Sequence, residues 1–319
     1  MTATLPTSAD VEQARLRIAG IALRTPLVRL RVPDAPAELY LKLENLQPIG
    51  SFKIRGAANA MAMRTPAELA RGVLTASAGN MAQGVAWCAR ERGVPCTVIA
   101  PVTAPAAKTR GIEELGGRVI RVPFERWWQC FEERAYPGIE ATFIHAFDDQ
   151  DVMAGNGSIG LELLEQLPDL DAVVIPWGGG GLSCGIASLL RARKPSCRVF
   201  AAEVATAAPL KAALRAGAPC NVDYRPSFVD GIGSRTVFPA MFERARGLID
   251  DALVASLQQV ADAVRLLAQR ARVVAEGAGA CPVACAVAGG AGPGKVVCIV
   301  SGGNIDPAKL SVLLGGATP

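Results

Sequence analysis

The chain has 319 residues, of which 50% are apolar and 19% are charged, and its formal net charge is +4. This globular composition supplies one large core or two lobes, and no apolar run reaches the roughly 18 residues of a membrane-spanning helix. The modest charge, without a basic run, argues against a nucleic-acid partner, and the N-terminal stretch shows no secretory signal pattern, so we expect a cytoplasmic protein.

The nine cysteines are scattered, and no CxxC pair occurs. Several lie among apolar or small residues, as Cys184, Cys281, Cys285 and Cys298 do. We therefore expect reduced, mostly buried thiols. Cys281 and Cys285 have no neighbouring histidine or second cysteine pair, which makes zinc binding the minor alternative.

The first segment in chain order with a chemical signal is GSFKIRGAANA (50–60). Ser51 is placed to cap a helix there, and Lys53 lies in its first turn. Most first-turn lysines are solvated, but Phe52, Ile54 and a run of small residues indicate a packed setting. Burial lowers the pKa of a lysine amine, and a neutral amine is what Schiff-base chemistry requires.

From about residue 73, β-rich runs alternate with helical patterns. Strands are expected at Val73–Ala76, Thr97–Ala100, Val119–Val122, Thr142–Ile144, Val173–Pro176, Arg198–Ala202 and Val296–Val300, and helices at Met81–Arg92, Ile159–Leu167 and Leu182–Arg193. Such alternation predicts an α/β fold with a parallel sheet and helices on both faces. The apolar runs VVIP and VVCIV suit strands buried on both sides.

Three small-residue segments directly follow predicted strands, namely SAGN (77–80), GGGGL (178–182) and SGGN (301–304). In open parallel sheets, ligands bind beyond the carboxyl ends of the strands, near helix N-termini. The tetraglycine lets the backbone reach positive φ, so that successive N–H groups can converge on an anion; a flexible turn is the alternative. Because no GK[ST] or GxGxxG pattern is present, we expect the phosphate of a ligand other than a nucleotide.

The segment LKLENLQPIGSFKIRGAANA (41–60) resembles the lysine segment of the fold-type II pyridoxal phosphate enzymes, in the threonine/serine dehydratase and serine racemase-like branch. The resemblance continues through TASAGNMAQGVAW, HAFDDQDVMAGNGSIGLELLEQ, IPWGGGGLSCGIA, VAEGAGA and VVCIVSGGNID, and covers most of the chain in the family's order. It implies a two-lobed α/β fold of the tryptophan synthase β type, with parallel sheets flanked by helices. A large cofactor-binding domain would comprise 1–67 and 151–319, and a small mobile domain 68–150. The resemblance also implies a homodimer.

The same resemblance assigns site residues for pyridoxal 5'-phosphate. Lys53 would hold the cofactor as a Schiff base and, once freed by the substrate, remove the Cα proton. The other cofactor contacts would be Phe52 against the ring, Asn80 at the ring hydroxyl, Gly178, Gly179, Gly180, Gly181 and Leu182 at the phosphate, Glu276 near the ring and Ser301 at the pyridine nitrogen. The substrate carboxylate would be bound by the loop of Ser77, Ala78, Gly79, Asn80 and Met81, through its N–H groups and the Ser77 hydroxyl.

The implied reaction is a β-elimination that converts a 3-hydroxy amino acid to a 2-oxo acid and ammonia. Threonine, serine or a bulkier analogue such as 3-phenylserine are the candidate substrates. Position 78 is alanine, where the family's serine racemases carry a serine that serves as acid/base opposite the lysine, so Ala78 argues against racemisation. A racemase, another β-elimination or β-replacement enzyme, and a non-catalytic pyridoxal-phosphate-binding protein remain the alternatives.

Two positions depart from the family's usual residues. Met81 stands where histidine is usual, and Trp177 where a small aliphatic residue is common. Either change is explained by core packing or by a reshaped pocket for a bulkier substrate, to which Trp127 and Trp128 could contribute.

Two further polar residues have structural interpretations. Glu203 and the carbonyl of Ala207 align with a divalent-cation loop of some relatives, but Pro209 replaces its aspartate. That leaves few ligands for a cation that prefers about six oxygens, so we expect no tight divalent site, and a weak ion is the alternative. For His145, the only histidine, we expect a structural or interdomain hydrogen bond.

Overall fold

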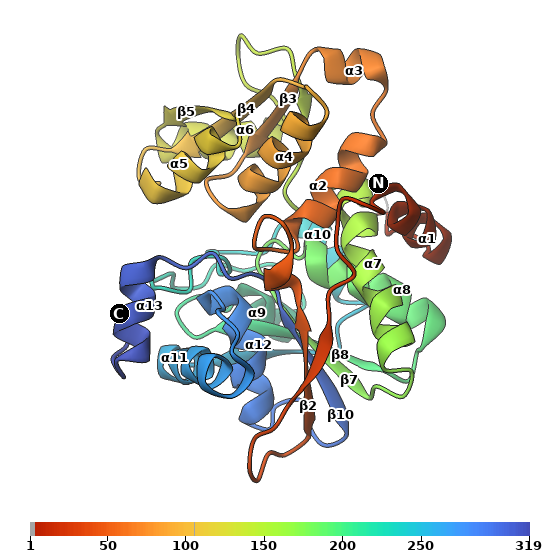
Figure 1. The fold of residues 1–319 in the computed structure, drawn as a ribbon, viewed down its shortest axis with the longest axis vertical. Coiled ribbons are helices and arrows are strands. Elements are labelled where there is room, and N and C mark those ends of the chain that lie inside the picture. The colour runs from red at the N-terminus through yellow and green to blue at the C-terminus, as the bar shows by residue number, and fades with distance from the viewer. Residues whose placement is uncertain (1–3, 105) are drawn as a thin grey trace.

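The computed structural model describes residues 4–104 and 106–319 (Figure 1). The strands are β1 (Leu27–Leu30), β2 (Glu38–Leu43), β3 (Val73–Ala76), β4 (Cys96–Pro101), β5 (Arg118–Val122), β6 (Thr142–Phe143), β7 (Ala172–Pro176), β8 (Arg198–Val204), β9 (Asp251–Ala255) and β10 (Lys295–Val300). The helices are α1 (Ser8–Arg17), α2 (Lys53–Ala62), α3 (Pro66–Ala70), α4 (Asn80–Glu91), α5 (Ala106–Glu114), α6 (Phe124–Glu133), α7 (Gln150–Gln166), α8 (Gly181–Arg193), α9 (Pro209–Ala216), α10 (Pro239–Ala245), α11 (Leu257–Leu266), α12 (Gly277–Val287) and α13 (Pro307–Leu314), with the 3-10 helix η1 (Glu44–Leu46) and the π-helix η2 (Leu267–Ala271).

The chain forms two sheets, each with its own helices (Figure 1). The six-stranded sheet has the order β1-β2-β10-β7-β8-β9, and all of its pairs are parallel except the antiparallel pair β1–β2. The four-stranded sheet has the order β5-β4-β3-β6 and is parallel throughout. We call the smaller sheet with α4, α5 and α6 the small lobe, and the larger sheet with α7 to α12 the large lobe.

The predicted α/β class with parallel sheets is confirmed, and each of the predicted strands overlaps a strand of the structure. The strands β1, β2 and β9 were missed, because LVRL, ELYLKL and DALVA interleave charged or small residues with apolar ones. All strands of the smaller sheet lie within 68–150 and all strands of the larger sheet lie outside it. The division of the chain into mobile and fixed domains at these residues stays a prediction.

Close helix packing brings α2, α7 and α8 together beneath the site. A Cβ on Gly185 would collide with the Met153 carbonyl, and one on Gly157 would lie 2.8 Å from the Gly185 carbonyl oxygen. A Cβ on Gly155 would likewise collide with the Arg55 carbonyl. Only glycine permits these helix axes to approach so closely, which explains the small residues of the DVMAGNGSIG segment.

A buried ionic network joins β2 and η1 to the helices α2 and α7. The Arg55 guanidinium binds Glu44 (Nε–Oε2 2.8 Å) and Glu162 (Nη1–Oε1 2.7 Å). Lys42 on β2 also binds Glu162, at 2.5 Å. All four side chains are at most 5% exposed, so each charge depends on its partners for compensation.

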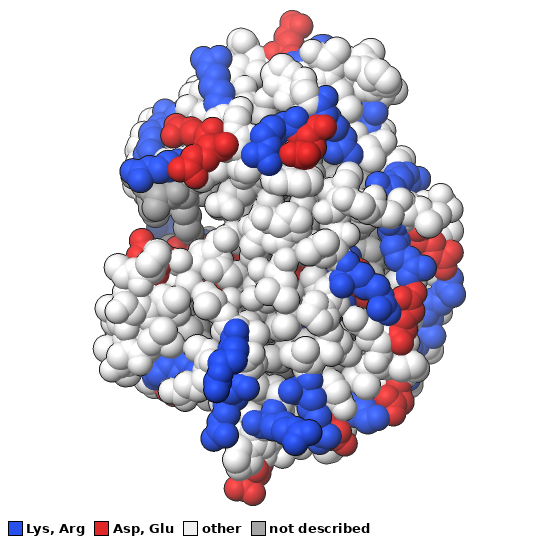
Figure 2. Space-filling view, in the orientation of Figure 1, with Lys and Arg blue, Asp and Glu red and all other residues white. Residues whose placement is uncertain are grey.

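The described surface carries charges of both signs. On the face shown in Figure 2, lysines and arginines alternate with acidic residues around a broad neutral centre. Among the described residues, no helix combines the length and apolar character needed to span a membrane. All nine cysteines are free thiols, and all but Cys220 are buried, as predicted.

Candidate active site

Lys53 is the first residue of α2, and its amine is buried between the lobes. Its Nζ donates to the carbonyl oxygen of Ala146 at 2.7 Å. Burial lowers the pKa of the Lys53 amine to about 8, although the nearby Glu276 carboxylate opposes the shift. The amine therefore has a substantial neutral fraction near physiological pH.

The expectation that Ser51 caps α2 was wrong. Phe52 is the N-cap residue, and no side chain caps this end of the helix. Ser51 is instead held in an extended bridge with Gly302, one residue too early to cap, and its buried hydroxyl has no hydrogen-bond partner among the described residues. The adjacent Phe52 N–H donates to the Ser301 carbonyl at 3.0 Å, which fixes Lys53 relative to the end of β10.

A chain of polar side chains lies across the cleft from Lys53. The Asn80 amide donates to Glu276 Oε1 at 2.8 Å, and Asn304 Nδ2 donates to Asn80 Oδ1 at 2.9 Å. Asn304 also donates to the Ile49 carbonyl at 2.9 Å, so the three side chains are held in fixed positions. Ser301, which is 3% exposed, ends the strand beside them.

Two helices begin at this cleft, and neither carries a side-chain cap in the described structure. α4 starts at Asn80, directly after Ser77–Gly79, and α8 starts at Gly181 with Gly180 at φ +90°. Uncapped first-turn N–H groups with the positive end of the helix dipole form anion sites. A carboxylate at the first and a phosphate at the second remain the predicted occupants of these two helix starts.

The turn between β6 and α7 closes over the glycine loop. The Phe147 ring lies where a Cβ on Gly179 would be, and the Phe147 backbone lies 2.8 Å from a Cβ position on Gly181. His145 shapes this turn, because its Nδ1 accepts the N–H groups of Phe147 (3.2 Å) and Asp148 (2.8 Å). Burial, with the charge of Arg134, lowers the pKa of His145 to about 3, so the imidazole is a neutral acceptor. The structural interpretation of His145 is confirmed.

Met81 and Trp177, the two positions that depart from the family's usual residues, lie in hydrophobic cores. Met81 is 2% exposed and packs in the core of the small lobe, and Trp177 is 1% exposed with its ring against Gly180. Both placements favour core packing over a reshaped pocket. Trp127 and Trp128 lie on α6, where Trp128 contacts Phe238 of the large lobe at 5.2 Å between ring centroids.

Glu203 binds a helix start in the structure. Its carboxylate accepts the N–H groups of Leu210 (2.9 Å) and Lys211 (2.8 Å) at the beginning of α9. Burial raises the pKa of Glu203 to about 7. Within residues 4–104 and 106–319 no cluster of three metal-ligating side chains occurs, and the absence of a tight divalent site stays a prediction.

Sequence reasoning missed several residues of the cleft. Asn304 belongs to the SGGN segment and could have been found as its polar end. Ala146 and Phe147 lie beside His145, the one residue of that turn to which a role had been given. Gly231, whose carbonyl lies 3.3 Å from a Cβ position on Gly178, carries no sequence signal.

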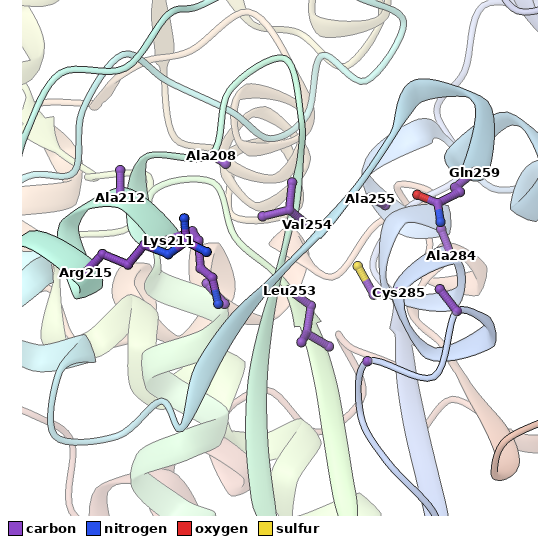
Figure 3. A pocket seen from close by; sticks show the side chains of 13 residues that line it. Ala208, Lys211, Ala212, Arg215, Leu253, Val254, Ala255, Gln259, Ala284 and Cys285 are labelled. Atoms are coloured by element: carbon purple, nitrogen blue, oxygen red, sulfur yellow. The ribbon is translucent and has the colours of Figure 1, made fainter.

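A cavity of about 610 Å³ lies elsewhere on the large lobe (Figure 3). It follows β9 at the sheet edge, between α9 and α12, and its polar lining includes Lys211 and Arg215. None of the predicted site residues lines it. The predicted site residues gather instead around Lys53, and that region stays the candidate site.

The cleft residues fit pyridoxal phosphate. A buried amine of lowered pKa suits its aldehyde, the Asn80 amide suits the ring hydroxyl, and the glycine loop at the start of α8 suits the phosphate. Ser301, directly after β10, would be the partner of the ring nitrogen. The individual roles of these residues remain predictions.

We expect the cofactor-free protein to bind pyridoxal phosphate covalently with a rate that rises through about pH 8, where Lys53 titrates. The neutral amine is the reactive form, so the rate should increase about tenfold from pH 7 to pH 9. Absorbance of the bound cofactor measures this rate. The Glu276→Gln variant should move the midpoint to lower pH, since Glu276 raises the pKa. A midpoint near 10.5, the ordinary lysine value, would contradict the burial argument.

Comparison with known proteins follows the same lines. Residues 18–302 match the family model described as pyridoxal-phosphate dependent enzyme. The chain is 39% identical over 279 residues to an L-threonine ammonia-lyase of Thermotoga maritima, covering 86% of this chain and 69% of the relative. It is 40% identical over 252 residues to an L-threonine ammonia-lyase of Geobacter sulfurreducens, covering 77% of this chain and 61% of that relative. Maize serine racemase has a similar structure, with a TM-score of 0.88, 31% identity and coverage of 97% of this chain and 96% of that one.

Proposed function

The chain belongs to the fold-type II pyridoxal-phosphate-dependent enzymes of the threonine/serine dehydratase family, and from this premise we propose that it eliminates water and ammonia from a 3-hydroxy amino acid. The observation that carries the proposal is the buried Lys53 amine of lowered pKa, which lies in the same cleft as two uncapped helix starts. One amine and two anion sites are what a phosphorylated aldehyde and an amino acid together require.

The chain's own residues supply binding and proton transfer. Bound pyridoxal phosphate supplies an electron sink for the charge that develops at the substrate Cα. The N–H groups at the start of α4 bind the substrate carboxylate and orient the Cα–H bond. The Lys53 amine removes the Cα proton and can return a proton to the departing hydroxyl. Ser301 is neutral, so a ring nitrogen held there would have no carboxylate partner, which would favour prompt loss of the β-hydroxyl.

Elimination is favoured over racemisation by Ala78. Racemisation needs a second acid/base on the face opposite Lys53, and a methyl side chain cannot transfer a proton. The loop otherwise offers the Ser77 hydroxyl, which accepts the Gly79 N–H at 3.2 Å and so belongs to the turn. The structural likeness to a racemase is a likeness of fold, and it does not supply this acid/base group.

Threonine is the first substrate candidate, because the relatives from Thermotoga maritima and Geobacter sulfurreducens are L-threonine ammonia-lyases. Serine differs from it by one methyl group, which is worth only about tenfold in discrimination by an apolar pocket. A bulkier substrate such as 3-phenylserine has lost support from Met81 and Trp177, whose side chains are buried in the cores.

The holoenzyme should release 2-oxo acid and ammonia from L-threonine and L-serine, while D-serine forms at least about 100-fold more slowly than pyruvate, since general acid catalysis on the second face is missing. A coupled 2-oxo acid assay and chiral chromatography measure the two rates. The Ala78→Ser variant should raise the racemisation rate. Bound cofactor without turnover of any hydroxy amino acid would instead favour a non-catalytic binding protein.

We also propose that the enzyme is a cytoplasmic homodimer. The nine free thiols suit a reducing compartment. Sedimentation of the purified holoenzyme tests the oligomeric state directly, and a monomer at micromolar concentration would contradict it.

A further inference from the structure

We propose that Asp148 is a positioning residue, which ties the small lobe to the large lobe through one carboxylate and so holds the turn that carries the resting partner of Lys53. This inference rests on the proposed function, because it concerns how the two lobes are held together around the substrate of that reaction.

The two oxygens of the Asp148 carboxylate bind arginines of different lobes. Its Oδ1 binds Arg244 Nη1 of α10 at 2.5 Å, on the large lobe. Its Oδ2 binds Arg134 Nη2 at 2.9 Å, directly after α6 of the small lobe. Arg134 also donates to the backbone carbonyl of Asp148 at 2.8 Å. A charged group with two guanidinium partners on separate bodies resists their separation.

The surroundings make this pair stronger than a surface ion pair. The side chains of Arg244 and Asp148 are 9% and 17% exposed, whereas Arg134 is 48% exposed. Although burial acts in the opposite direction, hydrogen bonding and charge from Arg244 lower the pKa of the Asp148 carboxyl, which stays ionised. The ion pair with Arg244 therefore contributes more to the link between the lobes than the ion pair with Arg134, because water screens it less.

The same short turn reaches the reacting amine. Asp148 donates its N–H to His145 Nδ1, and two residues before Asp148 the Ala146 carbonyl accepts Lys53 Nζ at 2.7 Å. Moving the Asp148 carboxylate would therefore also move the turn that lies against Lys53.

An aromatic contact between the lobes lies beside the ionic one. Phe238, the N-cap residue of α10, contacts Phe147 of the turn at 5.1 Å and Trp128 of α6 at 5.2 Å between ring centroids. Aromatic contacts hold the lobes without specifying a direction, whereas the two-armed carboxylate fixes one relative placement. A single substitution at Asp148 can therefore weaken the ionic link between the lobes while the aromatic contacts of Phe238 remain.

The test uses the holoenzyme with Asp148→Asn, which preserves the size of the side chain and removes its charge. We expect KM for threonine to rise about tenfold with a smaller change in kcat, because the closed placement of the lobes is weakened rather than the chemistry. Amide hydrogen exchange in segments 124–134 and 238–245 should quicken together. Glu243→Gln on α10, whose partner is the exposed Arg246, is the matched control and should change neither quantity.

Two further variants keep the proposal falsifiable. Arg134→Ala should give a weaker form of the same change, and Arg134→Lys should restore part of it, even if Asp148→Asn fails to fold. If Asp148→Asn and Arg134→Ala both keep a KM for threonine within twofold of wild type and unchanged amide exchange in both segments, Asp148 does not tie the lobes together. If the holoenzyme turns over no hydroxy amino acid, the proposed function fails, while the exchange measurement still decides whether Asp148 joins the lobes.

Discussion

The Lys53→Ala variant will lose at least about 10³-fold in kcat for elimination, because one substitution removes both the amine that holds the cofactor and the base for the Cα proton. Its fold should persist, since alanine is a good helix former and the Lys53 side chain makes one hydrogen bond within the described residues, to the Ala146 carbonyl. Steady-state assays of 2-oxo acid, with thermal unfolding as the check on the fold, measure the two effects.

Two companion variants separate the roles of charge and amine at this position. Lys53→Arg keeps the positive charge but cannot supply a neutral nitrogen, so it should be as inactive as Lys53→Ala. Lys194→Ala, which removes a partly exposed lysine bound to the Pro168 carbonyl, should retain full activity. Substantial elimination by the arginine variant would show that Lys53 is not the reacting amine.

The Arg55→Met variant should lose about 3–5 kcal/mol of unfolding free energy, because it leaves two buried carboxylates without their main partner. Arg55 is held by Glu44 and Glu162 between η1, α2 and α7, and all three residues are less than 5% exposed. Chemical denaturation of wild type and variant at neutral pH measures the difference. The Arg193→Ala variant, which breaks an exposed pair with Glu12, should change it by less than about 1 kcal/mol.

The effect of Arg55→Met should also depend on pH. Burial alone would raise the pKa of Glu44, but Arg55 outweighs it, and the carboxyl pKa lies below its ordinary value of 4.5. A carboxyl whose pKa is lowered on folding stabilises the fold at pH values above its pKa in the unfolded chain. This stabilisation is lost as the pH falls through the pKa of the folded state. The difference between wild type and variant should therefore shrink on acidification. A constant difference from neutral pH to pH 4 would contradict this assignment.

Local sequence patterns were sufficient where each element carried its own signal. The runs VVIP and VVCIV are buried on both faces as expected, and they became β7 and β10 at the centre of the larger sheet. The strands β1 and β2 gave no such signal, because Arg29 and Lys42 interrupt their apolar residues. Lys42 can be buried because Glu162 compensates its charge, and Glu162 lies 120 residues away in the chain.

The site divides in the same manner. Lys53 and the glycine loop could be recognised from their own segments, because each needs a residue type and a local backbone that the sequence displays. Ser51 could not be assigned correctly, since its bridge to Gly302 replaces the expected cap. The pairings of Asn80 with Glu276 and Asn304 join residues that are 196 and 224 positions apart.

By itself, then, the sequence determined the α/β class and predicted the reactive amine and the two anion-binding loops, because these depend on periodicity, side-chain chemistry and glycine backbone freedom within short segments. Only the tertiary structure decided how they act together. The lowered pKa of Lys53 arises from burial between two lobes, the resting partner of its amine comes from the turn after β6, and Asp148 receives one arginine from each lobe. Burial and charge pairing act through space, so no local pattern could specify them.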